Sequence, residues 1–136
     1  MILAELNLFI QFAFMFCVLI SLQLRSLGKI KAFGISMIAI IIAFVVSFLS
    51  VLLAFPNDPM FTTHASTTLA STTLTAAFGT HLFLALLSIG AAVWTVALWF
   101  KKTDFLAKSK IPALVTGFSW LLAFAIGLWL FINLNI

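Results

Sequence analysis

The sequence predicts an all-α membrane protein, a single domain over residues 1–136 whose four transmembrane helices form an antiparallel bundle with both termini outside. Apolar residues make up 65% of the chain and charged residues 7%, too few polar groups to cover a soluble domain. Four apolar segments reach the ~20 residues needed to cross a bilayer. All seven Lys and Arg residues fall within two short loops, at 25–31 and 101–110, and such loops face the cytoplasmic side of the plasma membrane.

Turn signals and loop residues bound the four predicted spans. Their expected positions are about 3–24, 33–55, 80–100 and 111–133. The second span ends before the turn-forming cluster Pro56–Pro59, because proline cannot continue a helix. Pro112 in the fourth span fits the first turn of a helix. The first span carries Glu5 and lacks a basic leading region, so we expect a retained helix and not a cleaved signal peptide.

The outer connection, about residues 56–79, is long and rich in threonine. It contains a tandem duplication, in which Ala65–Leu69 is followed by Ala70–Leu74. The positions that keep helical spacing up to His81 are Leu69, Thr73, Ala76 and Ala77. We therefore expect the third helix to begin at about residue 67, with threonine hydroxyls bonded to helix carbonyls, and an extended loop is the alternative.

Each span carries a line of small or polar residues at steps of three and four. The positions are Asn7, Gln11 and Ser21; then Ser36, Ala39, Ala43, Ser47 and Ser50; then His81, Ala85, Ser88, Ala92 and Thr95; then Ala113, Thr116, Trp120, Ala123 and Gly127. Small residues permit close helix packing in lipid, and buried hydroxyls find partners across helices. These lines are expected to face inward in an up-down bundle.

The opposite faces are crowded with aromatic residues, since the chain has 16 phenylalanines and no tyrosine. Those faces contact either acyl chains or the spans of a larger assembly, and the sequence leaves both open. Trp99 and Trp129 fit interfacial anchors, whereas Trp94 and Trp120 lie deeper and are expected to pack inside. Cys17 lies in the middle of the first span and is expected to be a small packing residue.

The side chains able to support chemistry gather toward the outer side. They are Glu5, Asp58, Met60, His64 and His81. Histidine, carboxylate and methionine can hold copper, and two histidines can hold a haem iron. On one continuous helix, however, the two histidines would lie on the order of 25 Å apart. The chain has no HxxxH, CxxC or HExxH pattern, so we assign no metal or cofactor and keep these five residues as the candidates for an outer-face site.

His81 begins the small-residue line of the third span and is therefore expected to point into the bundle. A single histidine at this level is expected to be hydrogen-bonded to a neighbouring helix, with Asn7 or Gln11 as the partner, and not to be a ligand. Asp104 lies among four lysines and is expected to be a solvated partner of that loop.

Several functional classes are disfavoured by what the chain lacks. It has no nucleophile with a neighbouring base, no glycine-rich phosphate loop and no pair of intramembrane carboxylates, which argues against an enzyme and against a proton-coupled transporter. Its basic residues are juxtamembrane loop residues, which excludes a nucleic-acid-binding face.

Several short motifs from Arg25 onward resemble a known family. They are Arg25–Lys29, Thr80–Ala85, Lys108–Pro112, Trp120 and Phe124–Leu130. Their order is similar to the Domain of Unknown Function 420 family, four-helix membrane proteins that include the CtaM-type maturation factors of haem-copper oxidases. That family places further histidines in both cytoplasmic loops, where this chain has Lys29–Ile30 and Ala107–Lys108, so that His81 alone carries over. The resemblance implies a scaffold that has lost metal or haem handling.

We therefore expect a non-catalytic accessory subunit of a larger membrane complex of energy metabolism, of the haem-copper oxidase or copper membrane monooxygenase type, with other transmembrane subunits and lipid as its partners. The first alternative is an assembly or metallation factor that holds copper or haem near the outer face with His81 and either His64 or Met60. The second alternative is a small transporter or quinone-contacting protein, which is disfavoured because the two halves show no internal repeat beyond hydropathy and basic loops.

Overall fold

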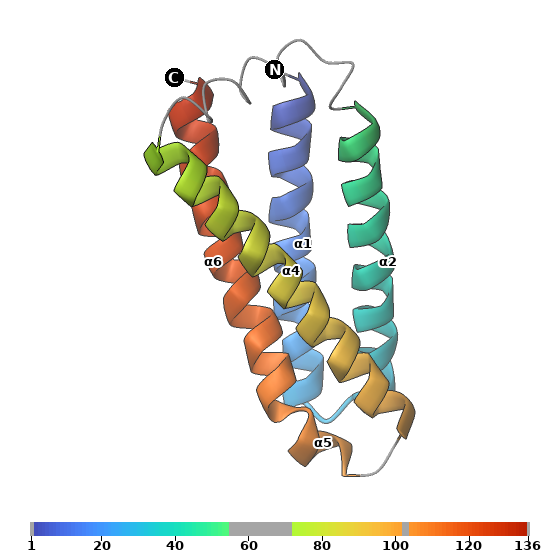
Figure 1. The fold of residues 1–136 in the computed structure, drawn as a ribbon. Helices are drawn as coiled ribbons and strands as arrows, with labels where there is room; N and C mark the ends of the chain where they lie inside the picture. Colours follow the sequence, from blue (N-terminus) through green and yellow to red (C-terminus); the bar gives the residue numbers. More distant parts are fainter. Residues whose placement is uncertain (1, 55–71, 102–103, 136) are drawn as a thin grey trace.

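The computed structural model of the chain describes residues 2–54, 72–101 and 104–135. Within these ranges the elements are helical (Figure 1). The helices are α1 (Ile2–Ser26), α2 (Ile30–Ala54), α4 (Thr72–Lys101), α5 (Phe105–Lys108) and α6 (Lys110–Asn135). Four of them are long and apolar enough to cross a membrane, which confirms the predicted class of an all-helical membrane protein.

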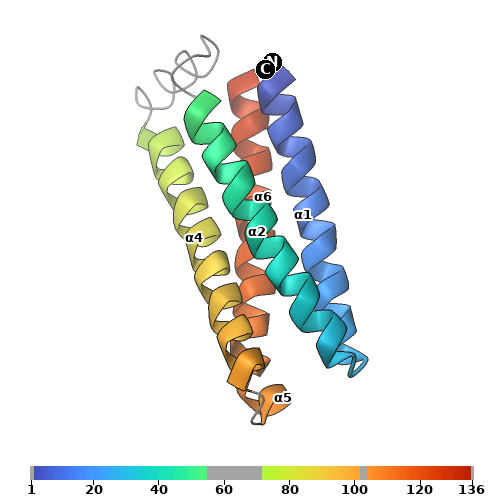
Figure 2. The ribbon, with the colours of Figure 1, turned by 90° about the vertical axis from the view of Figure 1, so that its right-hand side faces the viewer.

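The four long helices are arranged in a ring. α1 contacts α2 and α6, and α4 also contacts α2 and α6. Successive long helices run in opposite directions, so both ends of the chain lie at one end of the bundle (Figures 1 and 2). We call this the terminal end, and we call the opposite end, which holds the α1–α2 turn and α5, the loop end.

The third long helix includes part of the threonine-rich connection. α4 begins at Thr72 among the described residues, eight residues before position 80. The predicted start at about residue 67 and the turn cluster Pro56–Pro59 lie outside the described residues. Thr80 donates a hydrogen bond of 2.8 Å to the carbonyl of Ala76, which is the back-bonding expected of threonine inside a transmembrane helix.

A glycine ends α1. Gly28 has a φ of 76°, a left-handed conformation that only glycine adopts at little cost. Its N–H donates to the carbonyl of Arg25, and the N–H of Lys29 donates to the carbonyl of Leu24, both at 3.0 Å. This pair of bonds is the Schellman motif, and it satisfies the last carbonyls of α1 while reversing the chain into α2.

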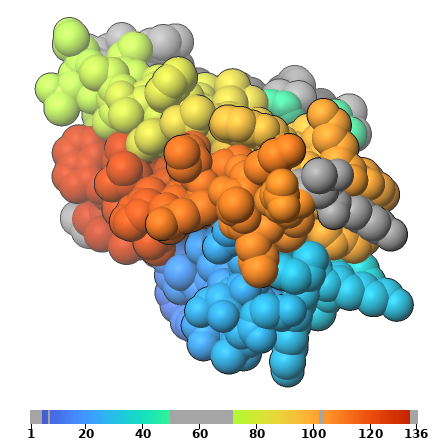
Figure 3. Space-filling model, turned by 90° about the horizontal axis from the view of Figure 1, so that it is seen from below, coloured from blue at the N-terminus to red at the C-terminus, as the bar shows by residue number. Residues whose placement is uncertain are grey.

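The second basic loop contains a short helix that the sequence analysis missed. Asp104 has a φ of 49° and leads into α5, whose Phe105 is buried. The ring of Phe105 lies 5.8 Å from that of Phe33, centroid to centroid. Arg25 at the end of α1 donates to the hydroxyl of Ser109 at 3.2 Å and to the carbonyl of Leu106. Seen from the loop end, the orange residues of α5 and of the start of α6 lie between the blue α1–α2 turn and the yellow α4 (Figure 3).

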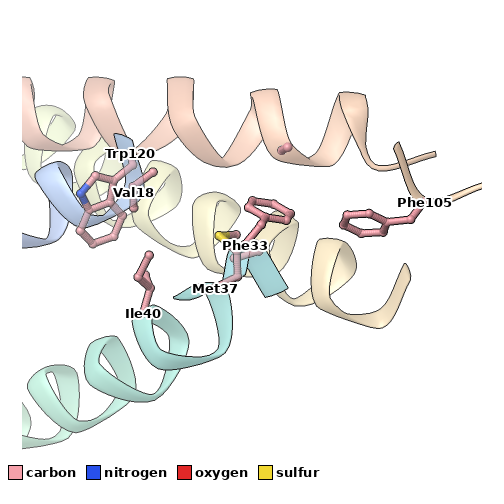
Figure 4. Packing of buried hydrophobic residues seen from close by; sticks show 8 residues of the cluster. Val18, Phe33, Met37, Ile40, Phe105 and Trp120 are labelled. Atoms are coloured by element: carbon pink, nitrogen blue, oxygen red, sulfur yellow. The ribbon is translucent and has the colours of Figure 1, made fainter. Parts of the chain in front are cut away.

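The apolar core lies in the loop half of the bundle. Its members come from α1, α2, α4, α5 and α6, and Figure 4 shows how they pack. We call it the core cluster, and it consists of Val18, Phe33, Met37, Ile40, Ala92, Phe105, Ala113 and Trp120. Phe33, near the start of α2, and Phe105 of α5 both belong to this cluster. Their packing holds the α1–α2 turn and α5 against the ends of the long helices.

The inward faces of the helices differ in kind. α4 and α6 pack through small residues, as predicted, because Ser88, Ala92 and Thr95 are all buried against α6. The prediction for the second span was wrong at Ala39 and Ala43, which are exposed, and held at Ser36, which is half-buried and bonds to Ser21 of α1. The inward face of α2 instead carries the large residues Phe33, Met37 and Ile40, which lie about 100° from the small-residue line.

The packing predictions for Trp94 and Cys17 were wrong, whereas the one for Trp120 is confirmed. The side chain of Trp94 is 54% exposed and that of Trp120 is 6% exposed. Both tryptophans lie deep along their spans, but Trp94 is next to Thr95 and so falls outside the face of α4 that packs on α6. Cys17 is likewise exposed, because its neighbour Val18 occupies the inward position on α1. Depth in a span therefore does not determine which face a residue occupies.

The terminal half of the bundle is less tightly closed than the loop half. Among the residues whose burial is described, none is buried on α1 before Val18, on α2 after Ile40 or on α4 before Ser88. Only α6 continues to bury side chains toward the terminal end, at Ala123 and Leu130. The interior of this half is consequently lined by half-buried side chains.

Candidate functional site

His81 lies in the terminal half on the side of α4 that faces α6. Its Nδ1 lies 2.7 Å from the carbonyl oxygen of Ala123. A carbonyl oxygen only accepts, so Nδ1 carries a proton and donates, and in the neutral imidazole the lone pair is then on Nε2. The predicted inward position is confirmed, and the bond of Nδ1 runs to the backbone of α6 and not to Gln11, the one predicted partner whose side chain is described. The side chain of Asn7 lies outside the described residues.

A glycine allows three helices to meet beside His81. A Cβ at Gly127 would lie 2.9 Å from Cε1 of His81 and 3.2 Å from Oε1 of Gln11. Both distances are shorter than ordinary contacts to carbon, so a side chain here would push the two groups away. Gly127 thus lets Gln11 of α1 and His81 of α4 approach the same point of α6.

A second hydrogen bond fixes the register of α4 against α6. Ser88 donates to the carbonyl of Thr116 at 3.0 Å. The donors His81 and Ser88 are seven residues apart on α4, and the acceptors Ala123 and Thr116 are seven apart on α6 in the opposite direction. Two side chain to carbonyl bonds, two turns apart, hold the imidazole at a fixed height in the bundle.

Trp120 is the member of the core cluster that lies one helical turn along α6 from Ala123, the partner of His81. Its indole ring makes edge-on contacts with Phe14 of α1 at 5.9 Å and with Phe44 of α2 at 5.5 Å between centroids. Its Nε1 is buried and has no hydrogen-bond partner among the described residues. Figure 4 shows this nitrogen on the side of the ring away from Phe105, toward the terminal end.

Side chains of the other long helices meet α6 at two places two helical turns apart, Phe14 and Phe44 at Trp120, and Gln11 and His81 at Gly127. We call these two places together the terminal-half site, and it consists of Gln11, Phe14, Phe44, His81, Trp120 and Gly127. It combines aromatic side chains with one imidazole, one indole N–H and one amide.

Of the two predicted outer-face candidates that the structure describes, His81 belongs to this site and Glu5 does not. Glu5 is exposed on α1, and Asp58, Met60 and His64 lie outside the described residues. The part of the chain that is described holds no group of three or more His, Cys, Asp or Glu residues arranged to bind a metal ion. Nε2 of His81 offers one nitrogen lone pair that could ligate a metal.

Sequence reasoning missed the roles of Trp120 and Gly127. Both were placed on the inward line of the fourth span, Trp120 as a packing residue and Gly127 as a small one. A signal for the first was present, because an indole N–H on an inward face needs an acceptor and the neighbouring positions of that line are small or apolar. No sequence pattern indicates that His81 bonds to a backbone carbonyl of another helix.

Comparison with known proteins adds no relative, since no family model, no curated protein and no solved structure matches the chain. The similarity of the short motifs to the Domain of Unknown Function 420 family stays a prediction.

Proposed function

We propose that the chain is a non-catalytic accessory subunit of a larger membrane complex, and that the face of α4 turned away from α6 binds a transmembrane helix of another subunit. We assign the parent complex to energy metabolism, of the haem-copper oxidase or copper membrane monooxygenase type. That assignment rests on the motif resemblance and on the shortage of ionisable residues within the spans.

The observation that carries the proposal is the distribution of the six glycines. Gly28 supplies a left-handed turn residue. Gly34, Gly117 and Gly127 each allow a close contact, because a Cβ there would lie under 3.0 Å from a side chain of another helix. The remaining two glycines, Gly79 and Gly90 of α4, supply neither a turn nor a close contact within the described residues.

Gly79 and Gly90 have no atom within 4 Å of the position that a Cβ would occupy. They are eleven residues apart, which places them about 20° apart around the helix and roughly 16 Å apart along it. The side chains between and beside them are exposed and apolar. We call this surface the α4 outer face, and it consists of Gly79, Phe83, Leu86, Gly90, Val93 and Ala97.

A transmembrane helix of a partner is the occupant that this surface fits. Glycine within a helix costs about 1 kcal/mol relative to alanine, and lipid chains need no notch in a helix surface. Small residues at helix crossings let two backbones approach closely, so two glycines three turns apart suit a helix that packs along α4. Phe83 and Leu86 would flank its path and supply packing area.

The polar contacts inside the bundle support a structural role. Ser21 and Ser36 share a hydrogen bond of 2.7 Å between α1 and α2, and Thr95 and Thr116 bond back to carbonyls of their own helices at 2.8 Å. These are helix-packing contacts between uncharged groups.

The orientation in the membrane belongs to the same proposal. Six of the seven Lys and Arg residues are among the described residues, and they lie at the loop end with the α1–α2 turn and α5 (Figure 1). Positive charge concentrated at one end favours the cytoplasmic side. The loop end would then be cytoplasmic, and both termini would be outside in the plasma membrane.

The test compares two leucine substitutions at exposed positions after mild detergent extraction. Gly90→Leu fills the notch of the α4 outer face, and Ala125→Leu, on the exposed side of α6, is the matched control. On native gels we expect the wild type and Ala125→Leu at high mass and Gly90→Leu largely released. A stable monodisperse monomer or a dimer of this chain in the wild type would overturn the proposal, and so would a Gly90→Leu chain that keeps the high mass.

A further inference from the structure

Three basic residues, from α1, α5 and α6, are gathered at Ser109 on the loop end. Nε of Arg25 donates to the hydroxyl of Ser109 at 3.2 Å, and Lys108 and Lys110 are the neighbours of Ser109 along the chain. The Cα atoms of both lysines are therefore about 3.8 Å from that of Ser109. Ser109 is buried, whereas both lysines are exposed. Figure 3 shows the orange residues of α5 and of the start of α6 beside the blue α1–α2 turn on this face.

The positive charge gathered there exceeds the negative charge nearby. Asp104, one helical turn from Lys108, is the one carboxylate among the described residues of the loop end, and it can neutralise at most one of the three cations. Two of the five N–H donors of Arg25 bond to Ser109 and to the carbonyl of Leu106, and the described residues give the other three no partner. A guanidinium fixed in this way keeps donors for an anion.

These cations lie where two membrane spans end. The apolar span of α1 ends at Ser26 and that of α6 begins at Lys110, so Arg25 and Lys110 are at the level where the hydrocarbon core meets the lipid headgroups. Two apolar side chains next to them in the chain are exposed, Leu106 by 50% and Ile111 by 67%. The same surface therefore offers cations to a headgroup and apolar area to an acyl chain.

We propose that this surface binds an anionic phospholipid. We call it the Ser109 surface, and it consists of Arg25, Leu106, Lys108, Lys110 and Ile111. The free N–H groups of the guanidinium donate to the phosphate oxygens, the two lysines attract the negative charge, and the two apolar side chains contact the acyl chains. In the orientation proposed above, the lipid belongs to the cytoplasmic leaflet. The inference concerns the loop end and is independent of whether the α4 outer face binds a helix.

A phospholipid fits this surface better than a soluble anion does. A free phosphate would use the three cations and leave Leu106 and Ile111 without a partner. Those two side chains adjoin the start of a membrane span, where acyl chains are the surrounding solvent. An anionic lipid satisfies the charged and the apolar part of the surface together.

Lys31 is a matched control for Lys110. Both lysines are exposed, and each lies at the start of a long helix, Lys31 as the second residue of α2 and Lys110 as the first of α6. Replacing either by glutamine removes one positive charge from the same end of the bundle. Lys31 does not belong to the Ser109 surface, and salt of about 0.15 M screens exposed charges that are more than about 8 Å apart. A local site therefore distinguishes the two variants, whereas a diffuse positive field does not.

The test is native mass spectrometry of the full chain in mild detergent, with any subunit that stays bound, titrated with phosphatidylglycerol or phosphatidylcholine. Both lipids carry a phosphate, but phosphatidylglycerol alone has a net negative charge. We expect the wild type to bind the first phosphatidylglycerol about fivefold more tightly than phosphatidylcholine. Lys110→Gln should weaken that binding about fivefold, the equivalent of about 1 kcal/mol for one basic residue, and Lys31→Gln by less than about twofold.

Lys108→Gln repeats the measurement from α5 and covers the case in which Lys110→Gln disturbs the start of α6. The proposal fails if the wild type binds the two lipids equally, or if Lys31→Gln weakens binding as much as the two variants of the Ser109 surface do. It also fails if inorganic phosphate at the concentration of the lipid displaces phosphatidylglycerol, since that result assigns the surface to a soluble anion. The mass of the protein assembly in the same spectra reports separately on the accessory role.

Discussion

Replacing Gly34 by alanine tests the contact between α2 and α4. A Cβ at Gly34 would lie 2.1 Å from Cε2 and 2.4 Å from Cδ2 of Trp99. Two carbon atoms normally pack at about 3.5–4.0 Å, so the indole must move by roughly 1.5 Å. The ring has little freedom to move, because Trp99 packs partly buried against the core cluster and its ring centroid lies 5.2 Å from that of Phe100.

The size of the effect follows from two opposing contributions. Overpacking of this kind typically costs about 1–3 kcal/mol, while alanine is favoured over glycine within a helix by about 1 kcal/mol. The net loss of unfolding free energy for Gly34→Ala is then between about 0 and 2 kcal/mol. Gly90→Ala has the same propensity gain and meets no atom within 4 Å, so the two variants should differ by about 1–3 kcal/mol.

The assay is reversible unfolding by SDS in mixed micelles, followed by the helical circular dichroism signal. Gly34→Ala is measured against Gly90→Ala, and both are repeated in a Trp99→Ala background. Removing the indole should abolish the difference, which gives a positive coupling energy in the double-mutant cycle. Equal stability of the two glycine variants with Trp99 present would refute the inferred contact between α2 and α4.

Two further substitutions probe the ends of the bundle. Gly127→Ala should push the imidazole of His81 by at least about 0.5 Å and break its bond to Ala123, so that ¹⁵N NMR of the ring shows mixed tautomers in place of one; an unchanged spectrum would contradict the site geometry. Arg25→Leu removes the bonds to α5 and should cost about 1–2 kcal/mol and speed amide hydrogen exchange in α5, whereas the matched charge loss Lys29→Leu should not. Equal exchange in both variants would contradict the anchoring role of Arg25.

The helices were predictable because each one leaves a long and direct signal. Runs of apolar residues interrupted by basic loops located α1, α2 and α6, and their observed bounds fall within three residues of those expected. α5 left no such signal, since its four residues are too few to show a helical period. Its position depends on Phe105 entering the core cluster, which is a tertiary effect.

The site was only partly predictable for a related reason. The inward position of His81 followed from helical spacing, but its partner did not, because the acceptor is a backbone carbonyl and every residue of the facing helix has one. Trp94 and Trp120 look alike in the sequence, yet one is exposed and one is buried. Which of them faces inward depends on how each helix is rotated in the bundle.

The most direct test of the accessory role is photocrosslinking from the α4 outer face. A photoreactive amino acid replaces Leu86, and the adduct is identified by mass spectrometry after purification of the high-mass complex. We expect one adduct, with a transmembrane segment of a different protein in that complex, and its loss in the Gly90→Leu background. Adducts with lipid alone or with a second copy of this chain would contradict the account.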